Sequence, residues 1–196
     1  KNTEWIIYTD AKFKYAENIK PYPNIKKHLD KFQQVITSDN RPYGLHRARD
    51  ERFFKGEKII ATRKCLTPTF TYTDFDCYLL AAFFIIKTER VNLKYLTALL
   101  NSKVTAVWLK HKGKMQGYNY QIDKEPLLAL PLMILSNSSQ QPFIDLVDKI
   151  LAITKDDDYP ENPGKQAKVK EYENEIDRLV YRLYSLTEEE VQVINR

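Results

Sequence analysis

Two basic stretches carry the side chains in this chain that are best suited to binding an anion. Residues 41–64 hold eight Arg and Lys residues against three acidic residues, and residues 103–114 hold four lysines and no acid. Arg matches phosphate oxygens and the acceptor edge of guanine, and Lys supplies a compact positive charge. From residue 155 onward, seven basic residues face eleven acidic ones. This asymmetry predicts a polyanionic partner on one side of the molecule, with an unevenly charged solvated surface as the alternative.

The second basic stretch runs into a loop with two glycines. Gly113 and Gly117 would let the backbone approach a partner closely, and the lysines around them would attract phosphates without regard to sequence. Gln116 or Asn119 could pair with the edge of an adenine. A solvated basic loop is again the alternative.

Residues for catalysis or metal binding do not form a recognised pattern. The histidines, at positions 28, 46 and 111, are far apart and have no Cys beside them. The chain has no G-x-S-x-G elbow, no Walker loop and no G-x-G-x-x-G turn. A metal-dependent nuclease could be assembled from Asp74 with Asp76, or Glu57 with Lys58, but exposed charges at strand ends explain these residues better.

Composition is typical of a soluble globular protein. The 196 residues suffice for one core with a helical extension, and 43% are hydrophobic and 29% charged. Cys65 and Cys77 form neither a disulfide framework nor a zinc cluster, which favours a reducing cytoplasm. The first thirty residues lack a secretory signal, and the longest apolar run, ten residues at 77–86, is about half a membrane span.

Periodicity and capping residues predict the elements of the first half. The N-terminal half is expected to contain a short strand at 5–8, a helix capped by Asn24 and ending near residue 36, strands at 58–62 and 69–75, and a buried strand or strand pair at 77–86.

The second half is expected to be mainly helical. Asn92 and Ser102 are predicted N-caps of two consecutive helices. Strands are predicted at 118–122 and 127–135, a polar linker at 136–142, and then helices, of which the last begins with a capping box at Thr187.

Several motifs together resemble one protein family. The run 95–103 (YLTALLNSK), Trp108, the glycine-containing loop and the segment 130–132 (LPL) are similar to the C-terminal specificity domain of TaqI-like adenine DNA methyltransferases and fused restriction–modification enzymes. Further resemblances are the segment 21–23 (PYP), the basic stretch from Arg41, the strand 57–60 (EKII) and the closing helix 175–191. The chain departs from the pattern at Ser185, where the family often has Gly, and at 131–133, where it often has Pro-Ile-Pro.

The resemblance implies an α+β fold, with a curved, mostly antiparallel sheet, packed helices and a C-terminal helical hairpin. We expect a target-recognition domain at 1–135 and a helical extension at 136–196. The domain would hold duplex DNA against an upstream methyltransferase domain that carries an Asn-Pro-Pro-Tyr motif and an S-adenosylmethionine site. Neither motif occurs here, so this segment is expected to be non-catalytic and to bind no cofactor. It would be the C-terminal part of a larger prokaryotic cytoplasmic enzyme, either a methyltransferase alone or one fused to a restriction endonuclease, with no role for a membrane.

Charge and loop position, rather than the family motifs, select the expected DNA contacts. They are Arg41, Arg47, Arg49, Arg63, Lys64, Lys112, Lys114, Gln116 and Tyr118. One alternative is an interaction module that packs on its catalytic domain or a partner subunit, motivated by the apolar helical stripe at 176–184. A stand-alone nuclease is the other.

Overall fold

A computed structural model describes residues 5–195, and the chain divides into two compact units, Lys1–Phe53 and Phe54–Arg196. The predicted α+β class is confirmed, because the described residues form helices and two three-stranded antiparallel sheets. The second unit extends across residue 136, and the expected boundary at that position remains a prediction.

The N-terminal unit is built around a small cluster of apolar side chains. Two 3-10 helices, Ala11–Lys14 and Ala16–Ile19, precede the helix α1, Pro23–Asp30. Phe13, Ile19 and Tyr43 form the buried cluster. The Tyr43 hydroxyl donates a hydrogen bond of 2.7 Å to Asp30 Oδ1, which ties the end of α1 to the following loop.

Three expectations for this unit are wrong. Residues 5–8 form no strand, and Trp5 is fully exposed, since no neighbouring strand completes a ladder there. Asn24 does not cap α1, which begins one residue earlier at Pro23. Proline suits the first helical position because its missing N–H would have had no acceptor in the helix. The helix also ends at Asp30 rather than near residue 36.

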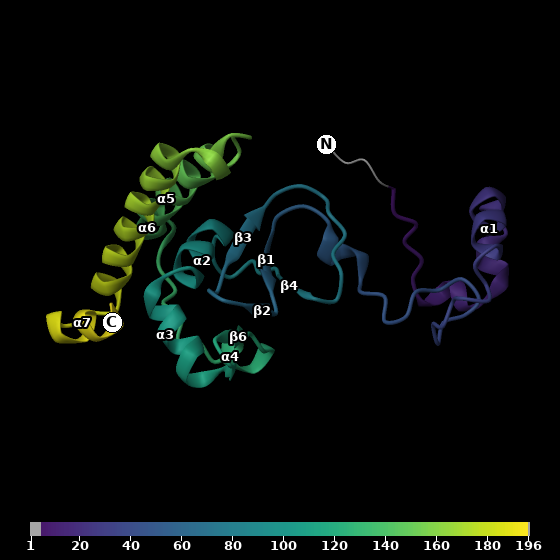
Figure 1. Ribbon diagram of the computed structural model, residues 1–196, viewed down its shortest axis with the longest axis horizontal. Coiled ribbons are helices and arrows are strands. Elements are labelled where there is room, and N and C mark those ends of the chain that lie inside the picture. Colours follow the sequence, from purple (N-terminus) through teal and green to yellow (C-terminus); the bar gives the residue numbers. More distant parts are fainter. Residues whose placement is uncertain (1–4, 196) are drawn as a thin grey trace. The chain divides into compact units, whose positions relative to one another are not determined.

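The first sheet forms the centre of the second unit (Figure 1). Its strands are β1 (Lys58–Thr62), β3 (Phe70–Thr73) and β4 (Phe83–Ile86), in the order β3-β1-β4. The helix α2, Leu93–Leu100, covers one face, where its leucines join the inward side chains of β1 and β3 in one core. Strands were correctly predicted at 58–62 and 69–75.

The apolar run 77–86 is only partly a strand. Pairing is confined to β4 at its end, and Leu80 is 78% exposed. Continuous apolarity therefore did not indicate a buried strand over the whole run, because Ala81 and Ala82 lie in an exposed turn before β4.

Lys58 is a fully buried lysine in the central strand. Its Nζ donates hydrogen bonds to the carbonyl oxygens of Gly56, at 2.8 Å, and Phe75, at 2.5 Å. A buried ammonium is tolerated only when its protons have acceptors. Lys58 thus connects the turn before β1 to the segment that follows β3.

Asn101 closes an edge of the first sheet. The backbone N–H of Phe70 donates to Asn101 Oδ1 at 2.9 Å, and Asn101 Nδ2 donates to the Phe70 carbonyl at 2.7 Å and to the Thr97 carbonyl at 3.0 Å. The side-chain amide thereby pairs with β3 as an adjacent strand would. This arrangement gives a physical reason for an Asn at the end of α2.

The predicted N-caps of two helices are confirmed. Asn92 caps α2, and Ser102 caps α3, Lys103–Lys112.

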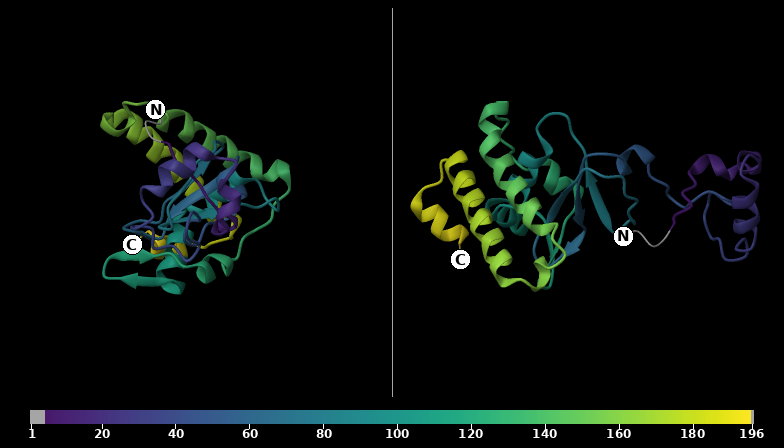
Figure 2. Two further views of the ribbon diagram at one scale, coloured as in Figure 1. Left: turned by 90° about the vertical axis from the view of Figure 1, so that its right-hand side faces the viewer. Right: turned by 90° about the horizontal axis from the view of Figure 1, so that it is seen from above.

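The C-terminal helices form the predicted hairpin. The helices α5 (Asn137–Thr154) and α6 (Pro163–Leu183) run side by side and pack on α2 (Figure 2). The stripe at 176–184 lies in this second core, where Ile176 and Val180 are buried against Tyr95 and Phe143. Within residues 5–195, no helix has the length and apolarity needed to cross a membrane.

Residues 127–142 differ from expectation. The segment predicted as a strand starts in a short helix, α4 (Lys124–Leu128), and continues without ladder partners. Pro131 cannot donate to a ladder, which disfavours pairing there. The predicted linker at 136–142 is instead the start of α5, with Ser136 as its N-cap. Pro142 lies inside α5.

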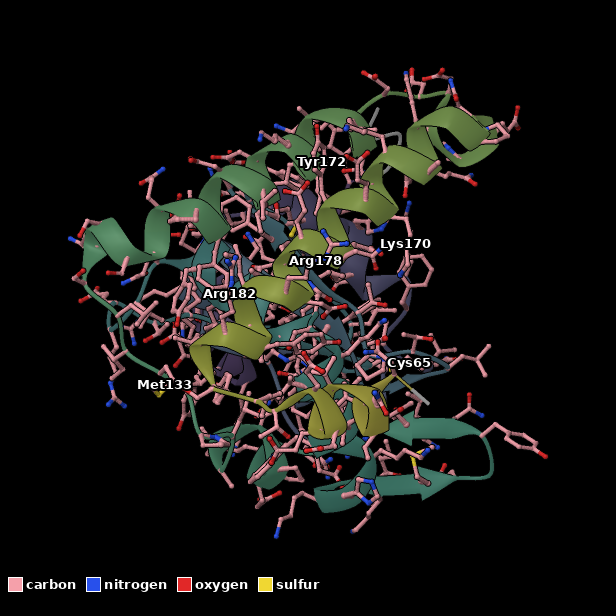
Figure 3. All side chains as sticks on the ribbon, turned by 90° about the vertical axis from the view of Figure 1, so that its left-hand side faces the viewer. Cys65, Met133, Lys170, Tyr172, Arg178 and Arg182 are labelled. Atoms are coloured by element: carbon pink, nitrogen blue, oxygen red, sulfur yellow. The ribbon has the colours of Figure 1, made fainter. Side chains whose placement is uncertain are left out.

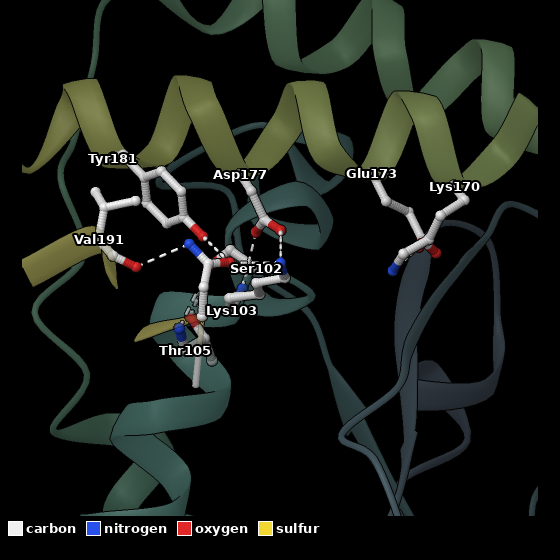
Figure 4. Close-up of polar contacts among 9 residues, drawn as sticks. Ser102, Lys103, Thr105, Lys170, Glu173, Asp177, Tyr181 and Val191 are labelled. Atoms are coloured by element: carbon white, nitrogen blue, oxygen red, sulfur yellow. Dashed lines mark hydrogen bonds and ion pairs between the residues drawn. The ribbon is translucent and has the colours of Figure 1, made fainter. Parts of the chain in front are cut away.

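Asp177 connects three helices at the closing end of the chain (Figure 4). Its Oδ1 accepts a hydrogen bond of 2.9 Å from the backbone N–H of Lys103, at the start of α3. The Lys103 ammonium reaches Asn195 Oδ1 at 2.6 Å, and Asn195 caps α7, Glu188–Ile194. The capping box predicted at Thr187 is confirmed at the other end of α7.

The buried position of Asp177 predicts a pH-dependent stability. Burial raises the pKa of its carboxyl above the usual value, and the hydrogen bond from Lys103 offsets this only in part. A carboxyl whose pKa is higher in the folded state than in the unfolded state stabilises the fold at pH values below its unfolded pKa. This stabilisation is lost as the pH rises through the folded pKa. We therefore expect the free energy of unfolding of the wild type to fall, relative to Asp177→Asn, as pH rises from below 4 towards neutrality. Asn keeps the acceptor and carries no charge.

Urea unfolding of the wild type and Asp177→Asn at matched pH values measures this difference. A difference that stays constant across the range, or one that changes in favour of the wild type as pH rises, would contradict the raised pKa of Asp177.

Candidate nucleic-acid interface

A second small sheet brings together residues that are about fifty positions apart in the sequence. Its strands are β2 (Lys64–Cys65), β6 (Asn119–Gln121) and β5 (Lys114–Gln116), in the order β2-β6-β5. Lys64 pairs with Gln121 on one side of β6, and Lys114 pairs with Gln121 on the other. The two lysines therefore flank one glutamine in a single row across the sheet.

Alternation along these strands separates a polar face from an apolar one. Side chains directly opposite each other in an antiparallel pair point to the same face, as do residues two apart in a strand. We call the polar side the sheet face. It consists of Lys64, Lys114, Gln116, Asn119 and Gln121, of which all but the half-buried Gln121 are exposed. On the opposite side, Cys65 and Tyr120 pack against the main core.

The chain forms the β5–β6 hairpin through two glycines. Gly117 has a φ of +61° and is followed by Tyr118, whose φ is negative, as in a two-residue type II′ turn. Gly113 joins α3 to β5, and a Cβ there would lie 2.5 Å from the Leu109 carbonyl oxygen. Tyr118 is 91% exposed at the tip of the turn. The sequence predicted both glycines as points where the backbone approaches a partner closely. In the structure, Gly117 forms the hairpin turn and Gly113 joins α3 to β5.

The last turn of α3 adds further positive charge beside β5. Lys110, His111 and Lys112 lie there, where the helix dipole favours cations. The Lys112 ammonium lies 5.7 Å from the centroid of the Trp108 ring. Trp108 is fixed in turn by a 3.0 Å hydrogen bond from its Nε1 to the Pro126 carbonyl. The Lys112 side chain therefore rests on a rigid aromatic surface.

Asp123 is an acidic residue that contacts the sheet face. One Oδ lies 3.9 Å from the Arg63 guanidinium and the other 3.9 Å from the Lys114 ammonium, while Gln121 donates to both oxygens at 3.2 Å. The two ion pairs are long, and the Lys114 side chain remains 76% exposed. Exposed pairs of this kind contribute little stability, so the two cations stay available to an external anion.

The predicted contact residues fall into two groups. Lys64, Lys112, Lys114, Gln116 and Tyr118 lie on the second sheet, its turn or the adjoining end of α3, and Arg63 immediately precedes β2. Arg41, Arg47 and Arg49 belong to the N-terminal unit; Arg41 and Arg47 are exposed, and the Arg49 carbonyl accepts a 2.6 Å hydrogen bond from Tyr8. Their role in contacting DNA stays a prediction for both groups.

Asn119 was recognised from the sequence as able to pair with an adenine edge, but neither it nor Gln121 nor Asp123 was selected among the expected DNA contacts. A strand was predicted over 118–122, so the period of two could have placed Asn119 and Gln121 on one face. The partner strand β5 was expected to be a loop, and for that reason the shared face with Lys64 and Lys114 was not recognised.

Two of the residues considered for a nuclease site have structural roles. Lys58 is buried, and Asp76 accepts a 2.9 Å hydrogen bond from the Gly56 N–H and pairs with Lys55 at 3.3 Å. Across residues 5–195, no three His, Cys, Asp or Glu side chains are grouped so that they could hold a metal ion.

Comparison with known families identifies the domain. The model of the TaqI-like C-terminal specificity domain matches residues 12–132, which is more than half of the chain. The chain belongs to this family. The matched residues of this specificity domain include both basic stretches and the whole second sheet, whereas the closing helix at 175–191 lies outside the match. Comparison with curated protein sequences gave no match.

Proposed function

We propose that this specificity domain binds duplex DNA in a sequence-dependent manner for a separate adenine-specific methyltransferase domain of the same polypeptide. Membership of the family makes the chain a DNA-recognition domain of a methyltransferase. The proposal adds that the sheet face and the end of α3 contact the DNA. S-adenosylmethionine would bind the methyltransferase domain and not this one, and the enzyme would belong to a cytoplasmic restriction–modification system.

The observation that carries the proposal is the arrangement of charge on the second sheet. Lys64 and Lys114 flank Gln121, and Lys112 lies two residues before Lys114. Lysines held on a strand or helix end at this spacing can neutralise successive phosphates, and this attraction dominates the affinity of DNA-binding proteins. The exposed amide side chains farther along the same face, Gln116 and Asn119, could contact base edges.

The acidic side chains of the unit lie largely elsewhere. The helix α6 carries acidic residues that pair with its own lysines, as in Lys168 with Glu171 and Lys170 with Glu173. The hairpin lies at an edge of the unit away from α5 and α6 (Figure 3). This separation would direct a polyanion towards the sheet face.

An exposed apolar segment supports the expected protein partner. Leu128, Leu132, Met133 and Ile134 are between 37% and 74% exposed in a stretch of seven residues. Exposed apolar patches commonly contact another protein surface. By contrast, the stripe at 176–184, which motivated the interaction-module alternative, is occupied within the unit by α2 and α5.

Binding of the chain to a randomised duplex pool at several salt concentrations tests the proposed function. We expect retention at low salt, a steep loss of affinity as salt rises, and enrichment of one word among the retained duplexes. Absence of binding at low salt, or binding with no enriched word, would contradict sequence-dependent recognition by this domain.

A further inference from the structure

Gln116 and Asn119 form a pair of amide side chains without structural partners. They are directly opposite each other at the turn end of the β5–β6 hairpin, and both are exposed. Neither side chain makes a hydrogen bond to any residue within 5–195. Most other amides of the unit do, since Asn101 closes a sheet edge, Gln121 bonds Asp123 and Gln140 bonds the Asn92 N–H and the Leu135 carbonyl.

The hairpin places these two amides where they can reach a base edge. The two-residue turn ends the ribbon beside them, with Tyr118 projecting at the tip. β2 pairs only with Tyr120 and Gln121, so the hairpin continues beyond it as two strands to the turn (Figure 2). The major groove of duplex DNA is about 12 Å wide and admits such a ribbon, while the minor groove is about half as wide.

We infer that Gln116 and Asn119 are specificity-determining residues that read adenines through the major groove. An amide can donate from its NH2 group to adenine N7 and accept from the adenine N6 amino group, a pairing that suits adenine better than any other base. Opposed residues in an antiparallel pair have Cβ atoms roughly 5 Å apart, so the two amides can reach neighbouring base pairs. This inference rests on the proposed function.

The lysines of the sheet face would hold the ribbon in that register. Lys114 lies two residues before Gln116 on the same face, a separation of roughly 7 Å along a strand. That distance brings its ammonium towards the phosphates that border the groove when the amides reach the bases. Gln121, whose amide is held by Asp123, would not be a reader.

The test uses the enriched word from the duplex pool and the 196-residue chain. We expect the word to contain an A·T pair whose replacement by G·C lowers the affinity of the wild type roughly tenfold or more. Replacing that adenine with 7-deazaadenine, which lacks the N7 acceptor, should lower it similarly. Gln116→Ala or Asn119→Ala should remove the discrimination at one position, while affinity for random duplex stays within about twofold.

Matched variants separate readout from folding. Gln116→Glu and Asn119→Asp keep the side-chain shape but cannot donate to N7, and they should lose the same discrimination. Gln192→Ala, at an exposed glutamine on α7, should retain it. An unchanged word and unchanged 7-deazaadenine effect in all four site variants would overturn the inference while leaving the proposed function standing. Failure of the wild type to bind any duplex would reject both.

Discussion

Replacing Lys64 and Lys114 together with alanine is expected to weaken binding to duplex DNA by roughly 60-fold at 0.1 M salt. Each lysine that neutralises a phosphate contributes about 0.9 to the slope of log affinity against log salt. Losing two contacts therefore lowers the magnitude of the slope by about 1.8. If binding at 1 M salt is unchanged, this difference in slope amounts to a loss of roughly 60-fold in affinity at 0.1 M salt. Fluorescence anisotropy with one labelled duplex at four or five salt concentrations measures both quantities.

A control double variant removes two lysines that lie away from the sheet face. Lys168 and Lys170 are on α6 and pair with Glu171 and Glu173. Lys168→Ala with Lys170→Ala should leave the salt slope unchanged. Equal losses in the two double variants would mean that net charge, and not the sheet face, determines affinity.

Lys58→Met is expected to lower the free energy of unfolding by about 3 kcal/mol. The change keeps much of the side-chain volume but removes the donor to the Gly56 and Phe75 carbonyls. Hydrogen bonds to a charged group contribute about 1.5–3 kcal/mol each, and the relief of burying an ammonium offsets part of this loss. Urea unfolding monitored by circular dichroism measures the change.

The matched control is Lys64→Met, which makes the same substitution at an exposed strand position. Surface substitutions away from special features usually change stability by less than about 0.5 kcal/mol. If Lys58→Met were as stable as Lys64→Met, the buried ammonium would have no role in connecting the β1 turn to the end of β3.

Elements determined by local signals could be predicted from the sequence. Asn92, Ser102 and Thr187 were recognised as N-caps because the side chain and the N–H that it accepts from are within three residues of each other. The strand 58–62 was recognised by its β-branched residues. These predictions needed no knowledge of distant contacts.

Elements that depend on distant partners could not be predicted. The strand β5 has three exposed residues and no apolar period, so only its pairing with β6 distinguishes it from a loop. The start of α5 is polar and therefore resembled a linker, although the apolar face of this helix packs on α2. The buried state of Lys58 likewise depends on a distant acceptor, the carbonyl of Phe75, which follows β3.

The candidate site shows the same limit. The residue types in the two basic stretches predicted attraction to phosphate, and they include Lys64, Lys112 and Lys114. The placement of Lys64 and Lys114 on either side of Gln121 follows from strand register, which is set by the non-local packing of Cys65 and Tyr120 against the core.

Amine labelling of the chain with and without saturating duplex DNA, read by mass spectrometry, tests the position of the DNA most directly. We expect Lys64, Lys112 and Lys114 to be protected from labelling in the complex, while Lys168 and Lys170 on α6 are labelled as in the free chain. Unchanged labelling of Lys64 and Lys114 in a DNA-saturated sample would contradict the assignment of the sheet face as the DNA-binding surface.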